Sequence, residues 1–550
     1  MIRLRSAGLL AALLLGGCAA RTSNQGDLTA TLEHIVRTGR GLPLQLEPDE
    51  RERLEQLYRS NGMSLIWHNA RGKPNRTGRE ARELLGHAER EGLRPADYAI
   101  ERIDSLGTAA AEEKEPALIA RADAALSAAL LRFLQHVHVG RVSPREAGVS
   151  IPAPRERHDY LELLRDGLNR GELKSVMEGL RPELEQYRLA LEALARLRNR
   201  VSDSAGKAPL NLPVPLKPGS PAPPEQLGLL ASRLAQTGDL SRIPEKPLLY
   251  EGDLVSGVQR LQSRMGLAPD GVIGKETLAE LNIPAEVRVR QLEMALERLR
   301  WIGDLPDEPL VLVNIPMFEL TAWRSPFRPG PPDFRSGVIV GKALNTETPV
   351  MIEEMQYVVF QPYWNVPQSI AVGEILPALE KDRHYLVKQN MEIVDGQSDG
   401  ATPVPASDNA LARVAEGTLR IRQRPGPANS LGPVKFMFPN RQNVYLHGTP
   451  AQELFDRSRR DFSHGCVRVE DPLGLAEWVL REKPDWTRDR IQQAMEDGSS
   501  ISRSVSLPRR LTVILFYSTA FVDPDGTARF ARDIYGHDRR LERALARVGP

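Results

Sequence analysis

At 550 residues with 41% apolar side chains, the chain can bury a large core, and its length favours three or four domains. Its formal net charge of +1 is distributed over 73 basic and 72 acidic residues. This balance excludes the one-sided basic surface that nucleic-acid binding usually requires, so we expect no nucleic-acid partner.

The N-terminus predicts a lipoprotein signal peptide over residues 1–17. Two arginines precede an apolar run that is too short to cross a membrane comfortably. The run LGGC at its end resembles a bacterial lipobox, in which Cys18 becomes the lipidated first residue of the mature chain. Acyl chains on Cys18 would hold the protein on a membrane, and Ala19 favours the periplasmic face of the cell envelope with anchoring to the outer membrane. An ordinary signal peptide or an uncleaved anchor is the alternative.

Residues 18–46 are mostly polar and are expected to form a tether. Residues 47–246 are expected to form a helical scaffold domain, because apolar residues recur there at spacings of three and four. The clearest stretches are ERLEQLY, REARELLGHAEREGL, RADAALSAALLRFLQHV and YRLALEALARLRNR. The proline-rich stretch 211–225 should be extended, either as a free linker or packed on the helices.

Residues 247–286 are expected to form a small compact unit. One helical face carries apolar residues, and Asp270-Gly271 supplies a turn before a second short helix. The alternative is a spacer whose groove binds nothing. The segment resembles three-helix peptidoglycan-binding modules through Val258, Leu261, Gln262, Gly266, Leu267, Asp270, Gly271, Gly274 and Thr277.

Residues 287–308 are expected to form a helix that connects this module to a mostly β domain over residues 309–521. Its predicted strands are short, β-branched and bounded by Gly, Pro or Asn. Residues 375–440 are expected to form an inserted capping subdomain that acts as a lid or binding loop. The alternative is an insertion without a functional role. Residues 522–550 are expected to form a C-terminal tail. The predicted fold is therefore multidomain α+β. The strand stretches are PLVLVNIP, FRSGVIVGK, MQYVVFQPYW, QNVYLHGTP and RLTVILFYSTAFV.

Cys466, in SHGCVR, is the only cysteine after residue 18. An unpaired cysteine in an oxidising compartment is normally a liability, so we expect it to have a function. A cysteine nucleophile requires a base for its proton and backbone donors for the oxyanion that forms when it attacks a carbonyl. His447 and His464 compete for the role of base, since an imidazole with a pKa of about 6.5 accepts a thiol proton at neutral pH.

Two alternatives remain for Cys466. Together with His447 and His464 it could bind zinc, but the His-x-Cys spacing is awkward and no further ligand lies clearly nearby in the sequence. A buried, inert cysteine is the other alternative, although it leaves the neighbouring histidines and glycines unexplained.

The segment around Cys466 resembles the signature of the L,D-transpeptidases, cysteine enzymes that cross-link peptidoglycan. The likeness extends through VNIP, IVGK, TPV, QPYWNVPQSI, RQRPGPANSLGPVKFMFPN, YLHGTP and ILFYSTAFVDPDG. It reaches back to GMSLIW, EGLRPADY and HVGRVSP in the helical region, as in the large periplasmic branch of the family. The resemblance implies a helical scaffold, a peptidoglycan-binding module and a β-rich catalytic domain with an inserted cap.

The resemblance also implies a role for each site residue. Cys466 corresponds to the nucleophile and His447 to the general base, with the backbone carbonyl of Gly448 orienting the imidazole. The amides of Gly465 and Cys466 would contribute to the oxyanion hole. The positions that shape the pocket are Ser463, His464 and Arg468.

Arg468 would hold a carboxylate of the stem peptide, with an internal salt bridge as the alternative. Tyr363 and Trp364 would line a substrate wall, with core packing as the default alternative. No metal or organic cofactor is required. The expected partners are peptidoglycan stem peptides and the membrane through Cys18, and the sequence identifies no protein partner.

Chemically, the resemblance implies a two-step acyl transfer. Cys466 would attack the carbonyl of the third residue of a tetrapeptide stem, expel D-alanine, and pass the acyl group to the amine of another stem in a 3→3 cross-link. Water in place of the amine would make the protein an L,D-carboxypeptidase, and a non-catalytic lipoprotein that tethers wall to membrane is a further alternative. If His447 holds the thiol proton at rest, we expect the pKa of Cys466 to lie below about 8.5.

Overall fold

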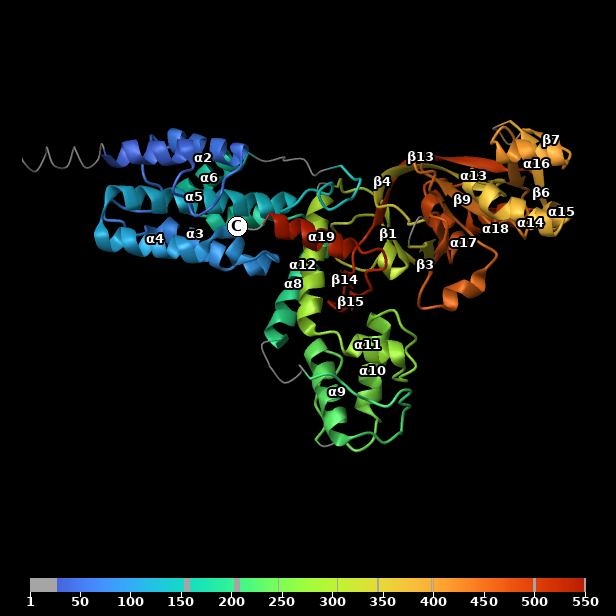
Figure 1. The fold of residues 1–550 in the computed structure, drawn as a ribbon, viewed down its shortest axis with the longest axis horizontal. Coiled ribbons are helices and arrows are strands. Elements are labelled where there is room, and N and C mark those ends of the chain that lie inside the picture. The colour runs from blue at the N-terminus through green and yellow to red at the C-terminus, as the bar shows by residue number, and fades with distance from the viewer. Residues whose placement is uncertain are drawn as a thin grey trace, which may run out of the picture.

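The computed structural model describes residues 27–152, 159–201, 208–245, 247–303, 305–343, 346–396, 398, 400–497 and 501–548. The predicted signal peptide and Cys18 lie outside these residues. Figure 1 shows a helical unit at one end, a β-sheet unit with a cap at the other, and a small helical unit projecting between them. The multidomain α+β prediction is therefore confirmed. Within the described stretches, no helix combines the length and apolarity needed to cross a bilayer.

The helical unit packs amphipathic helices around one apolar core. Residues 27–38 are also helical, and Leu32 and Val36 are fully buried in that core. The prediction of a tether over residues 18–46 is therefore wrong for its described part, because apolar residues recur there at helical spacing. The elements are Pro48–Ser60 (α2), Arg76–Gly86 (α3), Ile100–Glu113 (α4), Pro116–Val139 (α5), Tyr160–Arg170 (α6), Leu173–Gly179 (α7) and Glu185–Val201 (α8), with 3₁₀ turns at Ala88–Glu91 (η1) and Pro95–Tyr98 (η2).

The projecting unit is a three-helix module that is larger than predicted. Leu216, from the proline-rich stretch 211–225, is buried in its core and exchanges backbone hydrogen bonds with Ile273 at 3.0 and 3.1 Å. The module therefore begins near Leu210 rather than at residue 247, because the proline-rich chain supplies apolar side chains to the core. Its helices are Pro224–Thr237 (α9), Asp253–Arg264 (α10) and Lys275–Leu281 (α11).

The predicted connecting helix, Ala285–Trp301 (α12), runs through the centre of the molecule. Charged side chains are buried along it. Glu297 is only 2% exposed, and its carboxylate accepts hydrogen bonds from the Val142 amide at 3.0 Å and from Arg300 at 3.2 Å. Helix α12 is therefore a buried element that contacts other units, and it does more than connect the module to the sheet unit.

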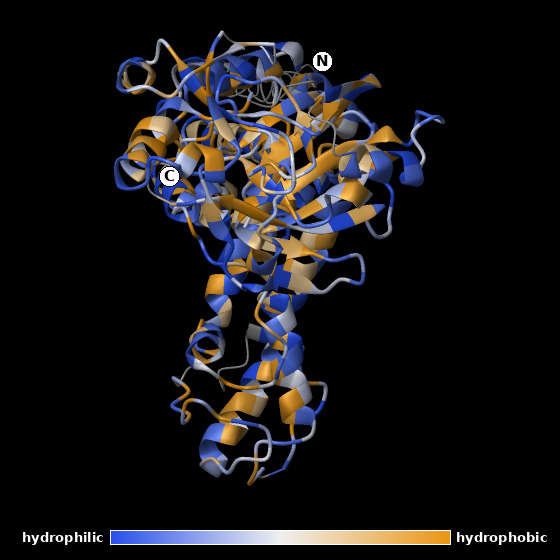
Figure 2. Ribbon diagram, turned by 90° about the vertical axis from the view of Figure 1, so that its right-hand side faces the viewer, coloured by the Kyte–Doolittle hydropathy of each residue, from blue (hydrophilic) through white to orange (hydrophobic). Residues whose placement is uncertain are grey.

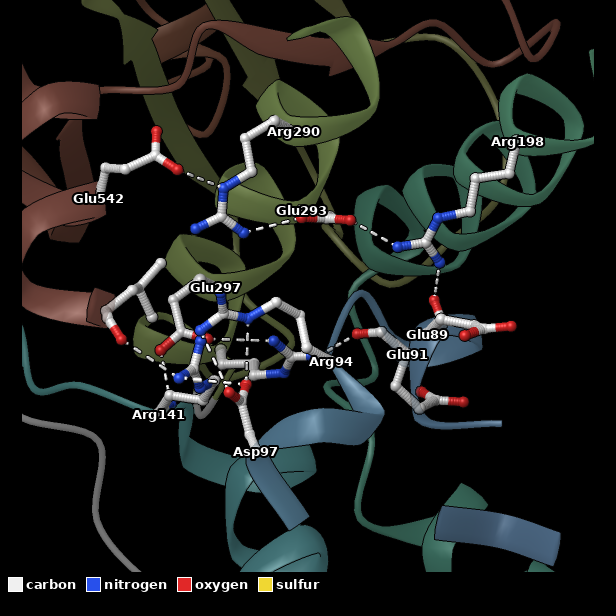
Figure 3. Close-up of polar contacts among 12 residues, drawn as sticks. Glu89, Glu91, Arg94, Asp97, Arg141, Arg198, Arg290, Glu293, Glu297 and Glu542 are labelled. Atoms are coloured by element: carbon white, nitrogen blue, oxygen red, sulfur yellow. Dashed lines mark hydrogen bonds and ion pairs between the residues drawn. The ribbon is translucent and has the colours of Figure 1, made fainter. Parts of the chain in front are cut away.

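Ion pairs join α12 to elements on both sides of it (Figure 3). Glu293 contacts Arg198 of α8 at 2.5 Å and Arg290 at 2.7 Å. Arg290 also contacts Glu542, which lies on the C-terminal helix His537–Arg547 (α19), at 2.7 Å. The predicted C-terminal tail is thus folded against α12, together with the hairpin Ala520–Val522 (β14) and Ala528–Phe530 (β15).

The sheet unit is one mixed sheet that closes on itself. Its strands are Leu310–Asn314 (β1), Glu319–Trp323 (β2), Phe334–Gly341 (β3), Met351–Phe360 (β4), Val434–Met437 (β9), Leu446–His447 (β10), Asp461–Ser463 (β11), Val467–Val469 (β12) and Arg503–Phe516 (β13). Their order is β11-β3-β12-β10-β9-β4-β13-β1-β2, and β2 also pairs with β3. Figure 2 shows apolar residues concentrated in the strands at the centre of this unit. Helices Pro472–Leu480 (α17) and Arg488–Glu496 (α18) also contribute to its core.

The cap is a separate sheet with its own apolar core. It spans residues 364–423 rather than the predicted 375–440, because β9 already belongs to the main sheet. Alternating sequence patterns cannot assign a strand to one of two sheets. The cap elements are Trp364–Asn365 (β5), Gln368–Ile370 (α13), the π-helical turn Ala371–Ile375 (η5), Leu376–Lys381 (α14), Tyr385–Lys388 (α15), Met391–Asp395 (β6), Thr402–Val404 (β7), Asp408–Ala415 (α16) and Arg420–Gln423 (β8).

Candidate active site

The predicted base and the predicted nucleophile lie on or next to two adjacent strands. Strand β10 contains His447, and strand β12 begins directly after Cys466. Strands β10 and β12 run parallel, with Leu446 opposite Val467 and His447 opposite Arg468. Leu446 and Val467 are fully buried in the core of the sheet unit. Because successive side chains alternate between the two faces of a strand, the neighbours of these two residues project from the opposite face. The residues placed together in this way are Tyr445, His447, Cys466 and Arg468.

The turn before β12 is held by Ser463. Its hydroxyl oxygen accepts a hydrogen bond from the Gly465 amide at 3.1 Å and donates to the Cys466 carbonyl at 2.5 Å. Gly465 has a φ of 116°, which favours glycine. Of the two amides expected in the oxyanion hole, that of Gly465 is therefore engaged, whereas that of Cys466 has no acceptor among the described residues. The Cys466 amide is the donor left for an oxyanion.

His447 is held in one orientation by the backbone. It is 4% exposed, and its Nδ1 donates to the carbonyl oxygen of Gly448 at 2.5 Å. The resemblance implies this contact, and a neutral imidazole that carries its proton on Nδ1 keeps Nε2 free to accept another. Gly432 lies so close that a Cβ there would be 2.7 Å from the carbonyl carbon of Gly448. Only glycine fits this approach, since φ at Gly432 is also positive, at 62°.

The electrostatics of the site favour a neutral pair at rest. Burial raises the pKa of the Cys466 thiol, while hydrogen bonds from Tyr445 and the charge of Arg468 oppose that rise. Burial and the positive charge of Arg468 lower the pKa of His447 to about 3. Both directions disfavour the thiolate–imidazolium pair expected from the sequence. The reason is that burial disfavours charge on both groups.

The competing histidine contacts the cap. His464 Nε2 lies 2.7 Å from Glu374 Oε1 on η5, and both side chains are exposed. The described parts of the chain contain no group of three or more His, Cys, Asp or Glu side chains placed to bind a metal. The arrangement around Cys466 therefore offers no ligand set for the zinc alternative.

Arg468 lacks the internal salt bridge that was its alternative role. Among the described residues it has no carboxylate within 4 Å, and its Nε is buried without a hydrogen-bond partner. Burial lowers its pKa, and the neighbouring Cys466 opposes this change. A guanidinium in this situation can receive a carboxylate from a ligand.

Tyr363 and Trp364 lie where the main sheet leads into the cap. The ring of Tyr363 is half-buried beneath Arg422, whose guanidinium carbon is 4.4 Å from the ring centre. Trp364 packs against the apolar core of the cap. These contacts agree with the packing alternative, and a role in a substrate wall stays a prediction.

Two family models match the chain. The model of the Scaffold domain matches residues 52–194, and that of the L,D-transpeptidase catalytic domain matches residues 308–505, which contain both His447 and Cys466. Residues 308–505 are an L,D-transpeptidase catalytic domain. The L,D-transpeptidase domain thus includes the cap, the turn that carries Cys466 and the strands of the closed sheet except most of β13, which continues to Phe516.

Two proteins with similar sequence or structure each align with about half of the chain. A Haemophilus influenzae protein provisionally named an L,D-transpeptidase is 32% identical over 295 residues, which are 53% of this chain and 58% of that protein. The chain therefore spans less than two thirds of that relative. The crystal structure of the L,D-transpeptidase from Xylanimonas cellulosilytica aligns with 55% of this chain and 98% of its own, at 16% identity. Its TM-score of 0.16 supports no inference.

Three residues around the L,D-transpeptidase site were not identified from the sequence. Tyr445 could have been found, because it lies two residues before His447 in a predicted strand and so shares its face. Thr348 lies in the TPV motif, whose role the sequence does not reveal. No local signal indicates Glu374, because its contact with His464 joins the cap to a turn 90 residues away.

We expect Thr348→Val to slow acylation of Cys466 by about tenfold, equivalent to about 1.4 kcal/mol in the barrier. The fully buried Thr348 hydroxyl donates to the Gly465 carbonyl at 2.8 Å and accepts from the Gly341 amide at 2.9 Å. Valine keeps the shape but leaves both groups unpaired beside Cys466. The measurement is the rate of covalent labelling by a carbapenem.

Thr108→Val is the matched control, because Thr108 is exposed and its hydroxyl donates only to the Asp104 carbonyl within α4. Equal labelling rates for both variants would show that Thr348 does not position the turn.

Proposed function

We propose that the protein is a peptidoglycan L,D-transpeptidase that forms 3→3 cross-links through a thioester on Cys466. The observation that carries this proposal is the parallel pairing of β10 and β12, which brings His447 and Cys466 to one face of the L,D-transpeptidase domain. A base and a thiol so placed are the components required for nucleophilic attack on an acyl group.

In the first step, Cys466 attacks the carbonyl of the third residue of a tetrapeptide stem. A bond forms between Sγ and this carbon while Nε2 of His447 takes the thiol proton. The Cys466 amide stabilises the oxyanion. The amide bond to the terminal D-alanine then breaks, and the leaving amine receives the proton from His447. Because the resting pair is neutral, the base acts during the attack rather than before it.

In the second step, the side-chain amine of another stem attacks the thioester. The new C–N bond forms, the C–S bond breaks, and His447 returns the amine proton to the sulfur of Cys466. The contact between Glu374 and His464 holds the cap beside the nucleophile's turn, which supports transfer by restricting bulk water. Water as the acceptor would give the L,D-carboxypeptidase reaction.

Arg468 is proposed to bind a carboxylate of the stem peptide. Its Nε is buried and unpaired among the described residues, and its strand position places it two residues after the nucleophile. A carboxylate there would pair with the guanidinium and fix the direction of the stem relative to Sγ.

Incubation with a carbapenem should increase the mass of the protein by one drug molecule, and the adduct should map to Cys466. The β-lactam carbonyl is an acyl electrophile like that of the stem, so the same attack leaves a covalent thioester. Intact-mass spectrometry checks this, with Cys466→Ala as the control. An unmodified mass for folded wild-type protein would contradict the proposed nucleophile and would favour the non-catalytic tether.

Purified tetrapeptide muropeptides then distinguish the two reactions of the thioester. A 3→3 dimer with release of D-alanine supports the transpeptidase, whereas a tripeptide with release of D-alanine supports the carboxypeptidase. Binding of peptidoglycan by the three-helix module is also part of the proposal. Membrane attachment through Cys18 and location on the periplasmic face of the outer membrane stay predictions from the sequence.

A further inference from the structure

A cleft of mixed polar and apolar lining lies between the three-helix module and the L,D-transpeptidase domain. Its volume is about 900 Å³, which is enough to hold part of a glycopeptide. A second hollow of about 310 Å³ continues from it, and both are lined by Gly266, Leu267, Glu276 and residues 458–460. One wall is therefore the turn between α10 and α11, and the other is the catalytic domain.

The side of the cleft formed by the catalytic domain belongs to the chain segment that connects His447 to Cys466. Residues 455–460 and Phe462 line the cleft, and they lie between His447 and Cys466 in the sequence. They begin in the 3₁₀ turn Gln452–Asp456 (η6) and extend into β11, which leads to the turn that holds the proposed nucleophile. A ligand bound in the cleft thus contacts a segment that is covalently continuous with the active site.

The module is held against the C-terminal part of the chain beside the cleft. Arg532, from the segment after β15, contacts Glu280 at 2.9 Å and Glu276 at 3.7 Å on α11. Arg264 on α10 donates to the carbonyl oxygen of Ala528 at 2.9 Å. The cleft is therefore bounded by ordered contacts between the module and the C-terminal part of the chain.

Each wall presents a cation that lacks a carboxylate partner. Arg457 is exposed, and its guanidinium carbon lies 5.7 Å from the centre of the Phe462 ring. Lys275 is exposed on the module wall. Among the described residues neither has a carboxylate within 4 Å, whereas Arg459 in the same cleft is paired with Asp461. Unpaired cations on facing walls favour an anionic ligand that contacts both.

We propose that this cleft binds a carboxylate-bearing glycopeptide of peptidoglycan across both walls, with Arg457 and Lys275 as its cationic contacts. The inference rests on the proposed function, because that function makes carboxylated stem peptides the substrate. It differs from binding by the module alone, since half of the site belongs to the catalytic domain. The cleft would hold the peptidoglycan beside the segment that leads to the proposed nucleophile.

The test uses full-length protein with Cys466→Ala, which prevents turnover, and a purified disaccharide tetrapeptide as the probe in calorimetric titrations. Arg457→Glu and Lys275→Glu should each weaken binding by about tenfold, because each loses one charge-assisted contact and gains a repulsion. Amidation of the stem carboxylates should weaken binding by a similar factor in protein that keeps both Arg457 and Lys275. Thermal unfolding of each variant verifies that it is folded.

Arg71→Glu is the matched control, because Arg71 is exposed in the helical unit and has no ion pair among the described residues. It should bind the probe as the parent does. Equal weakening by Arg71→Glu would indicate a general charge effect and overturn the proposal. If Lys275→Glu weakens binding of the probe and Arg457→Glu does not, the ligand lies on the module alone. That result would also overturn the proposal.

Two further outcomes separate this proposal from others. A poly-glutamate peptide that binds as tightly as the muropeptide would assign the cleft to acidic protein segments and overturn the peptidoglycan ligand. The carbapenem adduct on wild-type protein tests the proposed function independently. If that adduct forms while the wall variants bind normally, only the cleft proposal fails.

Discussion

His447→Ala should slow carbapenem acylation of Cys466 by about 10²- to 10⁴-fold, which is the usual contribution of general-base catalysis. The pH profile of Cys466 alkylation should nevertheless stay almost unchanged. His447 has its pKa lowered to about 3, so it carries no charge at neutral pH and its removal takes no cation away from the thiol.

Arg468→Gln provides the contrast. The charge of Arg468 lowers the pKa of Cys466 against the effect of burial, so its loss should move the alkylation profile to higher pH. The measurement is the iodoacetamide labelling rate against pH for wild type, His447→Ala, His464→Ala and Arg468→Gln. His464→Ala should shift this profile little, since its ring contacts Glu374 of the cap.

The pH dependence of acylation follows from the same pKa directions. A base must be neutral to accept a proton, and a pKa of about 3 keeps His447 neutral well below pH 6. Acylation should therefore show no inflection near pH 6.5, the usual value for histidine. An inflection there, or a clear upward shift of the alkylation profile in His447→Ala, would support the thiolate–imidazolium pair instead.

Glu297→Ala should destabilise the protein by about 3–5 kcal/mol, the cost typical of removing one partner of a buried ion pair. Its carboxylate accepts hydrogen bonds from the amides of Arg141 and Val142 and from the guanidinium of Arg300, which is 1% exposed. Without Glu297 these donors remain buried beside an uncompensated charge. The measurement is the free energy of unfolding in urea.

Two further variants serve as comparisons for the loss of stability in Glu297→Ala. Glu297→Gln retains one carbonyl acceptor for the backbone amides and should cost less than Glu297→Ala. Glu192→Ala removes the exposed partner of Arg188 on α8 and should change stability by less than about 1 kcal/mol. Similar losses for Glu192→Ala and Glu297→Ala would show that the burial of α12 does not matter for stability.

The helices and the main strands were predictable because their signals are local. Alternating residues around His447 indicated β10, and apolar spacing indicated α5 and α8. The short strands β11 and β12 were not predicted, because three residues carry too little periodicity. Residues 27–38 were misread as a tether although apolar residues recur there at helical spacing, because the helices that bury those residues lie elsewhere in the chain.

For the site, the sequence by itself determined the candidate reacting groups. Cys466 and His447 stand in motifs whose residue types already specify a thiol, a base and close backbone approach. Only the tertiary structure decided their state. The directions of both pKa shifts depend on burial and on the charge of Arg468. Arg468 lies two residues after Cys466 and opposite His447 in the β10–β12 pair. The tertiary structure also decided which amide is left for an oxyanion, because Ser463 engages that of Gly465. Local patterns specify which groups are present, whereas desolvation and hydrogen bonding depend on segments brought together by folding.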